Sequence, residues 1–475
     1  MNNRFEVSTE GMRSLHAGRK PWQLVKELVS NSWDEKIKTC GVDISHGDVP
    51  NEIILTVWDD GPGFKAIEDS WTLMGYTPKR ENPMSRGRFN LGEKELISVA
   101  LSAEIKSNDN KVSFPRTGGR IVEKLDDPIN GTRISCVLPW TYEDGQTIID
   151  ELRKFIVPKD VYYTVNGWII PYRKPIKISE AFLDTVLAGP DGLLKNSHRK
   201  CNIEIYEVPS GRSARLYEMG IPIQDIGCPY DVNIMQKVPL PPNRDTVKVK
   251  YLQAVYAAVL NCMYHKLNED QASEMWVRLG TEDKDHIKVE AAKKILEKRY
   301  GNKVVLWSSN SACNEKAMAN GFMVIHGKTL SATEREVFQQ AGLCTASTVF
   351  PIMFEPSEDV KDPTPKMQKV MEYAKFLGRE LIHKDINVRL FDSPGSNHLA
   401  EWGSNTMHFN VAKLGKEWFD KITPKVTSVI IHELAHVHGF GHDYAYGEMV
   451  DKLSGEAVHL AFTKHEEFAK YIKEN

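Results

Sequence analysis

Residues 27–34 read ELVSNSWD and lie in a longer segment, 21–39, whose apolar residues recur at helical spacing. On a helix, Glu27, Asn31 and Asp34 stand at positions i, i+4 and i+7 and share one face. Two carboxylates and an amide suit a magnesium–nucleotide site, because a carboxylate can take a proton from water and an amide oxygen can bind the metal. Solvated helix faces often show the same spacing, so this stretch alone leaves both interpretations open.

The composition of the chain excludes some classes of protein. Its 475 residues allow two to four domains. A net charge of −3, with 26% charged residues, does not favour a general nucleic-acid binder. The seven cysteines form no C-x-x-C pair, which predicts reduced thiols. The sequence has no signal-peptide-like start and no run of about 18 apolar residues, which predicts a cytoplasmic protein without a membrane span.

A glycine turn follows the next predicted strand. The β-rich run 52–58 leads into DDGPGF, which places Asp59 at the strand end before Gly61 and Gly63. A carboxylate there can accept a hydrogen bond from an exocyclic amine, and the glycines let the backbone approach a flat ring. A plain hairpin turn would contain the same residues.

A second glycine-bearing segment, SRGRFNLGEKE (85–95), precedes a predicted helix over 93–103 with Lys94 in its first turn. Glycine-bearing backbone at a helix N-terminus can hold phosphate groups. Farther on, Thr132 begins a predicted strand in NGTRIS (130–135). This mixture of helices and strands predicts an α+β sandwich with the helices on one face of a sheet.

With these four segments in this order, the sequence resembles the GHKL ATPase superfamily, which includes gyrase B, Hsp-type chaperones, histidine kinases and MutL. The resemblance implies a Bergerat α/β sandwich that binds ATP and Mg²⁺. It implies Glu27 as the general base, Asn31 as the magnesium ligand and Asp59 as the adenine reader, supported by Thr132. The residues matched to the motifs are Glu27, Asn31 and Asp34; Asp59, Gly61 and Gly63; Gly87, Asn90, Leu91, Gly92 and Lys94; and Gly131 and Thr132.

We call Gly87–Lys94 the lid segment, because the resemblance implies that it covers the phosphates. Asn90 stands where the family usually has the middle glycine of the lid. Asparagine tolerates left-handed backbone, so the lid can form with it.

The middle of the chain predicts mostly strands and helices. Residues 161–172 predict a hairpin turning on Asn166-Gly167, 200–240 several strands, and 247–268 a helix. The resemblance implies a transducer-like domain over 176–270, which sends a lysine into the ATP site. In QKVPLPPNRD (236–245), Lys237 and Arg244 are candidate sensors of the γ-phosphate, or else solvent-facing cations of a proline-rich loop.

Residues 271–355 predict a connector: a helix at 283–299, then a small α/β unit with a helix at 313–320 between two strands. The polar, proline-bearing segment 355–366 predicts a linker. Beyond it, the sequence predicts helices over 366–383 and 424–438 and strands near 386–391 and 405–410.

The segment SVIIHELAHVHGFGHD (428–443) contains the H-E-x-x-H motif at His432, Glu433 and His436. On a helix the two histidines lie one turn apart on the same face, so both can bind one zinc ion, and Glu433 can act as general base. His442 follows Gly439 and predicts a third ligand, with Asp443 as an alternative. Three ligands and an open position describe a catalytic zinc site. A histidine-rich helix end is the competing interpretation.

This segment resembles the zincin metallopeptidases. Gly439 and His442 match the metzincin pattern, whereas the compact arrangement is more similar to SprT/WLM-type minimal proteases. Glu456 could be a downstream ligand of the gluzincin type. The strand at 405–410 is expected to be the edge strand against which an extended peptide substrate lies.

The whole chain is therefore predicted to be α+β and multidomain, with divisions at 1–175, 176–270, 271–355 and 356–475. It resembles large ATP-binding proteins of tailed bacteriophages, including relatives of the rIIA group. That resemblance implies the cytoplasm of an infected bacterium. The expected ligands are ATP, Mg²⁺ and Zn²⁺, and the expected partners are a protein or peptide substrate and a second copy in an ATP-dependent homodimer.

Two hypotheses on function follow. In the first, the nucleotide cycle controls a zinc peptidase. In the second, the chain is an ATP-driven switch or clamp that binds a host protein or a nucleic acid, and its zinc site is structural or vestigial.

Overall fold

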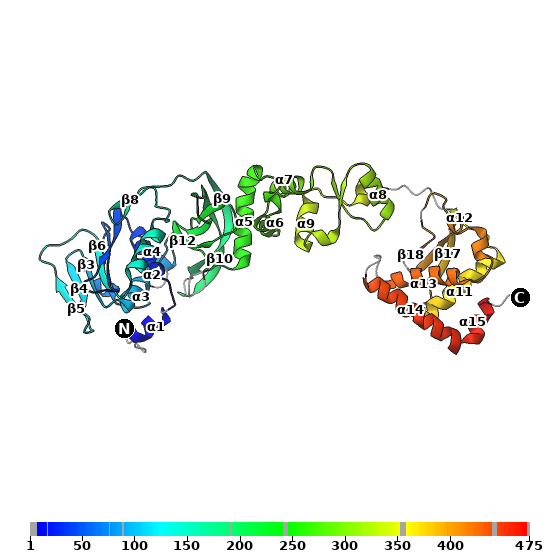
Figure 1. Cartoon of the computed structure of the whole chain (residues 1–475), viewed down its shortest axis with the longest axis horizontal. Coiled ribbons are helices and arrows are strands. Elements are labelled where there is room, and N and C mark those ends of the chain that lie inside the picture. The colour runs from blue at the N-terminus through cyan, green and yellow to red at the C-terminus, as the bar shows by residue number, and fades with distance from the viewer. Residues whose placement is uncertain are drawn as a thin grey trace. The chain divides into compact units, whose positions relative to one another are not determined.

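The computed structural model describes residues 7–16, 18–75, 77–87, 90–189, 192–240, 246–351, 358–396, 398–403, 405–438 and 444–472. The described residues form two compact units, one within Met1–Arg299 and Ser331–Ala341, the other within Tyr300–Leu330 and Gly342–Asn475 (Figure 1). Residues 271–355 are divided between the units. The α+β, multidomain fold class is confirmed, and the finer domain boundaries stay predictions.

The first unit contains an eight-stranded sheet in the order β5-β4-β3-β6-β2-β1-β7-β8. Neighbouring strands are antiparallel, except that β1 and β7 are parallel. The strands are β1 (Thr39–His46), β2 (Ile53–Asp59), β3 (Ser102–Ser107), β4 (Asn110–Phe114), β5 (Ile121–Lys124), β6 (Thr132–Leu138), β7 (Tyr162–Val165) and β8 (Trp168–Ile170). The predicted hairpin is confirmed: Asn166 and Gly167 join β7 to β8 with positive φ angles of 50° and 75°.

Helices cover one face of this sheet, as predicted for the sandwich. They are α2 (Pro21–Trp33), α3 (Gly92–Val99) and α4 (Tyr142–Leu152), and α1 (Thr9–Leu15) packs against α3. Alternate residues of β2, such as Leu55 and Val57, share one buried core with Leu28 of α2, Leu96 of α3 and Ile148 of α4. Side chains on a strand alternate between faces, so this shared core fixes which face carries the helices.

Two predicted helices of this unit end earlier than expected. The helix predicted over 21–39 ends at Trp33, and Thr39 already pairs with strand β7. The helix predicted over 93–103 ends at Val99, and Ser102–Ser107 forms a strand between β4 and β6. In both places backbone pairing with neighbouring strands outweighs the local preference for helix.

A second sheet follows in the same unit, in the order β12-β11-β13-β10-β9. Its strands are β9 (Lys177–Ala188), β10 (Leu194–Glu207), β11 (Arg215–Glu218), β12 (Ile221–Asp225) and β13 (Tyr230–Ile234). Helix α5 (Val249–Met263) packs against β9, and α6 (Met275–Thr281), α7 (Val289–Tyr300) and α9 (Ala332–Gln340) follow. The helix predicted from 283 begins at Val289, because the Asn261 side chain bonds His286 O and Lys288 N outside helical geometry.

The second unit begins with a small α/β part, as predicted. Its parallel strands are β14 (Val304–Leu306) and β15 (Met323–Ile325), with α8 (Ser311–Ala319) between them in the chain. The short helix α10 (Ala346–Val349) contacts α8. Cys313 and Ala317 of α8 lie in a small buried core with Val305 of β14.

The C-terminal part of this unit has a four-stranded sheet in the order β16-β17-β19-β18. Its strands are β16 (Glu358–Asp359), β17 (Asn387–Asp392), β18 (Ala400–Gly403) and β19 (Thr406–Asn410), and its helices are α11 (Pro365–Ile382), α12 (Val411–Leu414), α13 (Pro424–Ala435), α14 (Tyr444–Thr463) and α15 (His465–Ile472). One buried core joins Tyr373, Phe409, Ile430 and Leu453 from these elements.

Two predictions for this part are wrong. The described residues of the predicted linker 355–366 include β16, which pairs with β17, and the start of α11. The strand at 405–410 is not an edge strand, because β19 lies between β17 and β18. The short strands β16 and β18 form the two edges of this sheet.

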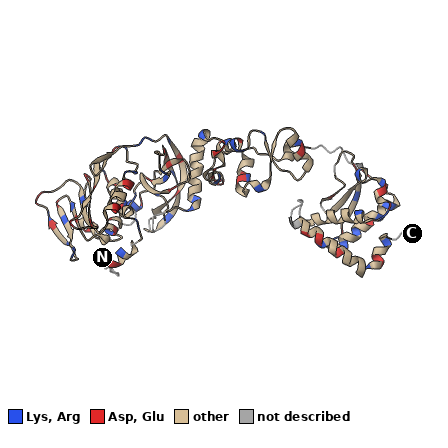
Figure 2. Cartoon of the chain, in the orientation of Figure 1, with Lys and Arg blue, Asp and Glu red and all other residues tan. Residues whose placement is uncertain are grey.

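Acidic and basic side chains are mixed over helices and strands of both units (Figure 2). This distribution agrees with the small net charge of the chain. In the part of the chain that the structure describes, no helix is both long and apolar enough to cross a membrane.

Candidate functional site

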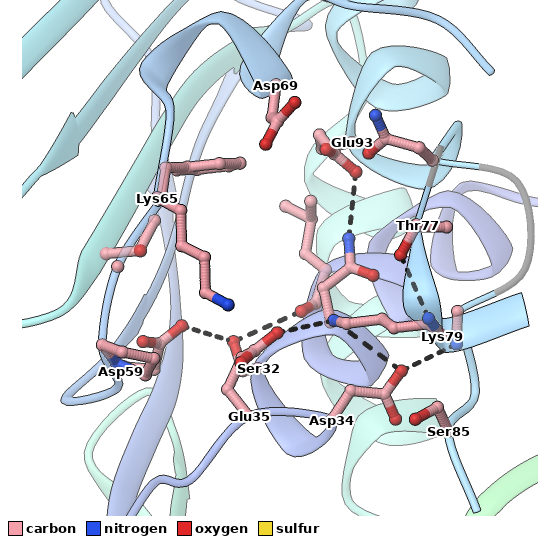
Figure 3. A pocket seen from close by; sticks show the side chains of 18 of the residues that line it. Ser32, Asp34, Glu35, Asp59, Lys65, Asp69, Thr77, Lys79, Ser85 and Glu93 are labelled. Atoms are coloured by element: carbon pink, nitrogen blue, oxygen red, sulfur yellow. Dashed lines mark hydrogen bonds and ion pairs between the residues drawn. The ribbon is translucent and has the colours of Figure 1, made fainter. Parts of the chain in front are cut away.

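A cavity of about 490 Å³ opens between α2, the ends of β2 and β6, the segment 77–87 and the start of α3 (Figure 3). Segments far apart in the sequence meet there, because β2 and β6 are paired and α2 and α3 pack together. The predicted site residues that line the cavity are Asn31, Asp34, Asp59, Gly63, Gly87, Asn90 and Thr132. The four predicted segments therefore border one cavity.

Asp59 is anchored at one end of the cavity. Ser32 Oγ donates to Asp59 Oδ2 at 2.8 Å, and the backbone N–H of Gly61 donates to Oδ1 at 3.0 Å (Figure 3). Burial raises the pKa of Asp59, and the hydrogen bonds from Ser32 and Gly61 oppose that shift. The carboxylate is thus fixed in place and can accept a further hydrogen bond from a ligand amine.

Gly131 allows β6 to start against the end of β2. It has a positive φ of 87°, and a Cβ atom there would lie 1.9 Å from the carbonyl oxygen of Asp59. The next residue, Thr132, pairs with Asp59 and lines the cavity. A side chain at position 131 would therefore displace the two strand ends that hold Asp59 and Thr132.

The change Gly131→Ala is expected to lower the free energy of unfolding of the first unit by about 3 kcal/mol. Part of this cost is the strain of an alanine with left-handed backbone, and the rest is the overlap of its Cβ with the carbonyl oxygen of Asp59. Gly118→Ala is the matched control, because Gly118 has a φ of 88° and open space where a Cβ would stand. The control should cost only about 1 kcal/mol. Urea unfolding of both variants measures the difference, and equal costs would contradict the overlap.

Asn31 lies at the lid end of the cavity with Glu93. Asn31 Nδ2 donates to Glu93 Oε2 at 3.0 Å (Figure 3). Lys94 Nζ lies 2.5 Å from Glu93 Oε1 and 3.0 Å from Asn90 Oδ1. Asn90 has a positive φ of 53°, so its backbone is left-handed. This is the conformation that asparagine was expected to tolerate at this position.

Asp34 holds the start of the lid segment. Its Oδ1 accepts from the backbone N–H of Arg86 at 2.8 Å, and its Oδ2 accepts from the backbone N–H of Gly87 at 2.7 Å. The Arg86 guanidinium also donates to the carbonyls of Trp33 and Met219. Burial lowers the pKa of Arg86, and the neighbouring Asp34 carboxylate opposes that shift. Arg86 thus ties the lid to both α2 and the second sheet.

Besides Lys237, five predicted site residues stand outside the described lining of the cavity: Glu27, Gly61, Leu91, Gly92 and Lys94. Glu27 is buried on α2 beneath the start of α3, where a Cβ on Gly92 would lie 2.7 Å from Glu27 Cβ. Gly92 therefore lets α3 start directly against Glu27. The roles assigned to these five residues stay predictions.

Lys237 contacts Lys79, one of the residues that line the cavity. Its side chain is 1% exposed and donates to the carbonyl of Lys79, while its backbone N–H donates to Pro83 O at 2.9 Å. Lys237 is not among the described residues that line the cavity. Arg244 lies outside the described residues. The predicted role of Lys237 as a phosphate sensor stays a prediction.

Several lining residues were not predicted. Lys79 Nζ lies 2.7 Å from Glu35 Oε1 and 3.9 Å from Asp34 Oδ2, which places a cation on the wall of the cavity (Figure 3). Lys65 and Asp69 line the opposite side. These residues stand in segments without a motif, so no sequence signal marks them. Glu93 could have been predicted as a lining residue, because it follows Gly92 directly and stands in the first turn of a helix behind a glycine loop.

The second candidate site lies at the C-terminal end of α13, where His432 is in the helix and His436 is its C-cap. The rings of His432 and His436 are 5.4 Å apart between centroids, as expected for one helix face. The hydroxyl of Tyr446, on α14, lies 2.6 Å from His432 Nδ1. Metal-binding histidines typically form such a contact through the ring nitrogen that does not bind the metal.

Glu433 lies between the two histidines in the sequence and is 7% exposed. Burial raises the pKa of Glu433 to about 7, and the charge of Glu401 adds to that shift. Glu401 lies on the edge strand β18, which contacts α13. The edge of this sheet is thus next to the histidine pair.

The predicted third ligand, His442, its alternative Asp443 and Gly439 lie outside the described residues. Over the described ranges, no group of three or more His, Cys, Asp or Glu residues is placed to hold a metal ion. The exposed Glu456 lies 3.9 Å from Lys452 Nζ on α14. The zinc site is supported by two histidines and a buried carboxylate and stays a prediction.

Two solved structures share a low similarity with this chain. One is the ATPase region of Saccharomyces cerevisiae topoisomerase II, with a TM-score of 0.30 and 11% identity over 42% of this chain and 62% of that one. This chain thus spans a little under two thirds of that structure. The other is the N-terminal domain of a DNA repair protein, with a TM-score of 0.30 and 13% identity over 50% of this chain and 91% of that one. No protein-family model matches, and a search of curated proteins gave no match.

Proposed function

We propose that the first unit binds and hydrolyses MgATP in the cavity between α2 and the eight-stranded sheet. The observation that carries the proposal is the convergence of four separate segments on one cavity of about 490 Å³. The Asp59 carboxylate lies at one end of it, and the Asn31 amide and the lid glycine Gly87 lie at the other. A volume of this size suits a nucleotide-sized ligand.

Each end of the cavity has its own role in this proposal. Asp59 accepts a hydrogen bond from the exocyclic amine of adenine, and Thr132 supports that end. Asn31 binds Mg²⁺ through its amide oxygen, and Lys79 adds positive charge near the phosphates. Glu27 takes the proton from the attacking water. The lid segment covers the phosphates with its backbone N–H groups.

Replacing Asp59 with alanine is expected to weaken MgATP binding by about 10- to 100-fold, because a hydrogen bond to a charged group is lost. Isothermal titration of the full chain measures the change. Asp60→Asn is the control: Asp60 Oδ1 accepts from the backbone of Lys38 and Thr39, outside the described lining of the cavity. A wild-type protein that binds no MgATP, or an Asp59 variant with unchanged affinity, would refute the proposal.

We further propose that the C-terminal part is a zinc peptidase. The supporting observation is the histidine pair at the C-terminal end of α13, with buried Glu433 on the same helix and the edge strand β18 in contact with it. When bound, zinc would be held by His432, His436 and His442 and would polarise the substrate carbonyl and the bound water. Glu433 would serve as the base for that water, and the edge strand β18 would pair with the backbone of an extended peptide.

Both sites in one chain support control of the peptidase by the nucleotide, with ATP-driven closure and dimerisation as the coupling step. The competing function is an ATP-driven clamp for a protein or nucleic acid. Peptide cleavage that changes with a non-hydrolysable ATP analogue supports the first. Bound zinc without cleavage, together with an analogue-dependent change of oligomeric state, supports the second.

A further inference from the structure

The Asn31 amide has two unlike ends, and only one of them can bind a cation. Its oxygen accepts and can coordinate Mg²⁺, whereas its NH₂ group donates. In the cavity, Nδ2 of Asn31 donates to Glu93 Oε2 at 3.0 Å. An ionised carboxylate only accepts hydrogen bonds, so this contact selects one of the two amide orientations. Oδ1 is left free of Glu93 and lies toward Gly87 of the lid.

Glu93 is itself held from the opposite side. Its side chain is buried, and Lys94 Nζ lies 2.5 Å from Oε1. Lys94 is equally buried and also donates to Asn90 Oδ1 at 3.0 Å. The ammonium keeps a carboxylate stable in this buried place, because a buried charge needs a partner. A continuous chain of contacts therefore runs from Asn90 of the lid through Lys94 and Glu93 to Asn31.

We propose that Glu93 is a positioning residue that keeps Oδ1 of Asn31 turned toward the cavity for Mg²⁺. This inference rests on the proposed nucleotide function. Glu93 acts through Asn31, and Lys94 holds Glu93 in place. Asn90 stands where the family usually has a lid glycine, and its Oδ1 accepts a second hydrogen bond from Lys94. The same chain of contacts therefore fixes both Asn90 of the lid and the proposed metal ligand Asn31.

The first test compares Glu93→Ala, Glu93→Gln and Glu95→Ala in the full chain. The probe is a non-hydrolysable ATP analogue, titrated with Mg²⁺ and separately in EDTA. Glu93→Ala should raise the Mg²⁺ concentration for half-saturation by about 10-fold or more, as outer-shell changes do at metal sites, with binding in EDTA unchanged. Glu93→Gln should recover most of the loss, since its amide oxygen can accept from Asn31. Glu95 lies on the same helix as Glu93, and Glu95→Ala removes its 2.7 Å ion pair with Arg19. This change should alter neither the Mg²⁺ concentration for half-saturation nor the binding in EDTA.

The second test reverses the hydrogen bond. Asn31→Asp places a second carboxylate against Glu93 and should weaken Mg²⁺ binding through repulsion of like charges. The double variant Asn31→Asp/Glu93→Gln lets the glutamine NH₂ donate to the new aspartate. It should bind Mg²⁺ more tightly than Asn31→Asp alone. Two residues that acted independently would not show such a rescue. This comparison holds even where Glu93→Ala lowers stability.

The outcomes separate the two proposals. A wild-type protein that binds no nucleotide refutes the nucleotide function, and the role of Glu93 falls with it. Wild-type binding of Mg²⁺ and analogue, with the same Mg²⁺ dependence in Glu93→Ala, overturns the role of Glu93 alone. Equal damage by Glu93→Ala and Glu93→Gln, without rescue in the double variant, assigns Glu93 as a direct ligand or base and also overturns it.

Discussion

Replacing Glu27 with glutamine is expected to lower the turnover of ATP by about 10²- to 10⁴-fold, while MgATP still binds. Glutamine has nearly the same shape as glutamate, so the close packing of Glu27 against Gly92 is kept. It cannot take a proton from the attacking water, so only the chemical step loses its base. Phosphate release at saturating MgATP gives the turnover, and isothermal titration gives the affinity.

Two glutamates among the described lining of the cavity serve for comparison. Glu35 lines it and pairs with Lys79, and Glu93 lines it and contacts Asn31. Glu35→Gln and Glu93→Gln should each keep turnover within about 10-fold of wild type, because neither residue is the proposed base. If Glu93→Gln abolished turnover and Glu27→Gln left it intact, the base would be Glu93, and the role taken from the family resemblance would be wrong for this chain.

Much of the first site could be predicted because its residues stand in short motifs with a local geometry. The spacing of Glu27, Asn31 and Asp34 predicts a shared helix face, and α2 does place Asn31 and Asp34 at the cavity. The strand end at Asp59 and the strand start at Thr132 are also where the sequence places them. Local periodicity and turn residues carry this information.

The contacts between segments could not be predicted in the same way. Asp34 was expected to bind the cofactor, yet its two oxygens accept from the backbone of Arg86 and Gly87. Lys237 was expected in the site, and its side chain contacts the carbonyl of Lys79. Such pairings join residues 52 to 158 positions apart and depend on how sheets and loops pack. No local pattern encodes them.

The C-terminal site shows the same division between local pattern and topology. The apolar run before His432 predicts the helix, and α13 forms with His432 in it and His436 at its C-cap, close to the ring of His432. The edge strand was misassigned, because residues 400–403 are too few to show a period of two. Strand order depends on pairing across the sheet, and β19 pairs on both sides.

Replacing Glu433 with glutamine is expected to lower the cleavage of a fluorescein-labelled casein by about 10²- to 10⁴-fold, because the zinc-bound water loses its base. The residue is buried next to the histidine pair, and glutamine fills the same volume. Zinc content, measured by metal analysis of the purified chain, should therefore stay at the wild-type level. ATP turnover should also be unchanged, since Glu433 belongs to the other unit.

Glu456→Gln is the matched control for this change. Glu456 is an exposed carboxylate on α14 that was considered as an alternative metal ligand, and it lies 3.9 Å from Lys452. Loss of zinc in that variant would make it a ligand in place of His442, whereas unchanged zinc and cleavage leave His442 as the third ligand.

Cleavage that survives Glu433→Gln would exclude a zincin mechanism. A wild-type chain that binds zinc and cleaves nothing would leave the nucleotide-driven clamp as the function.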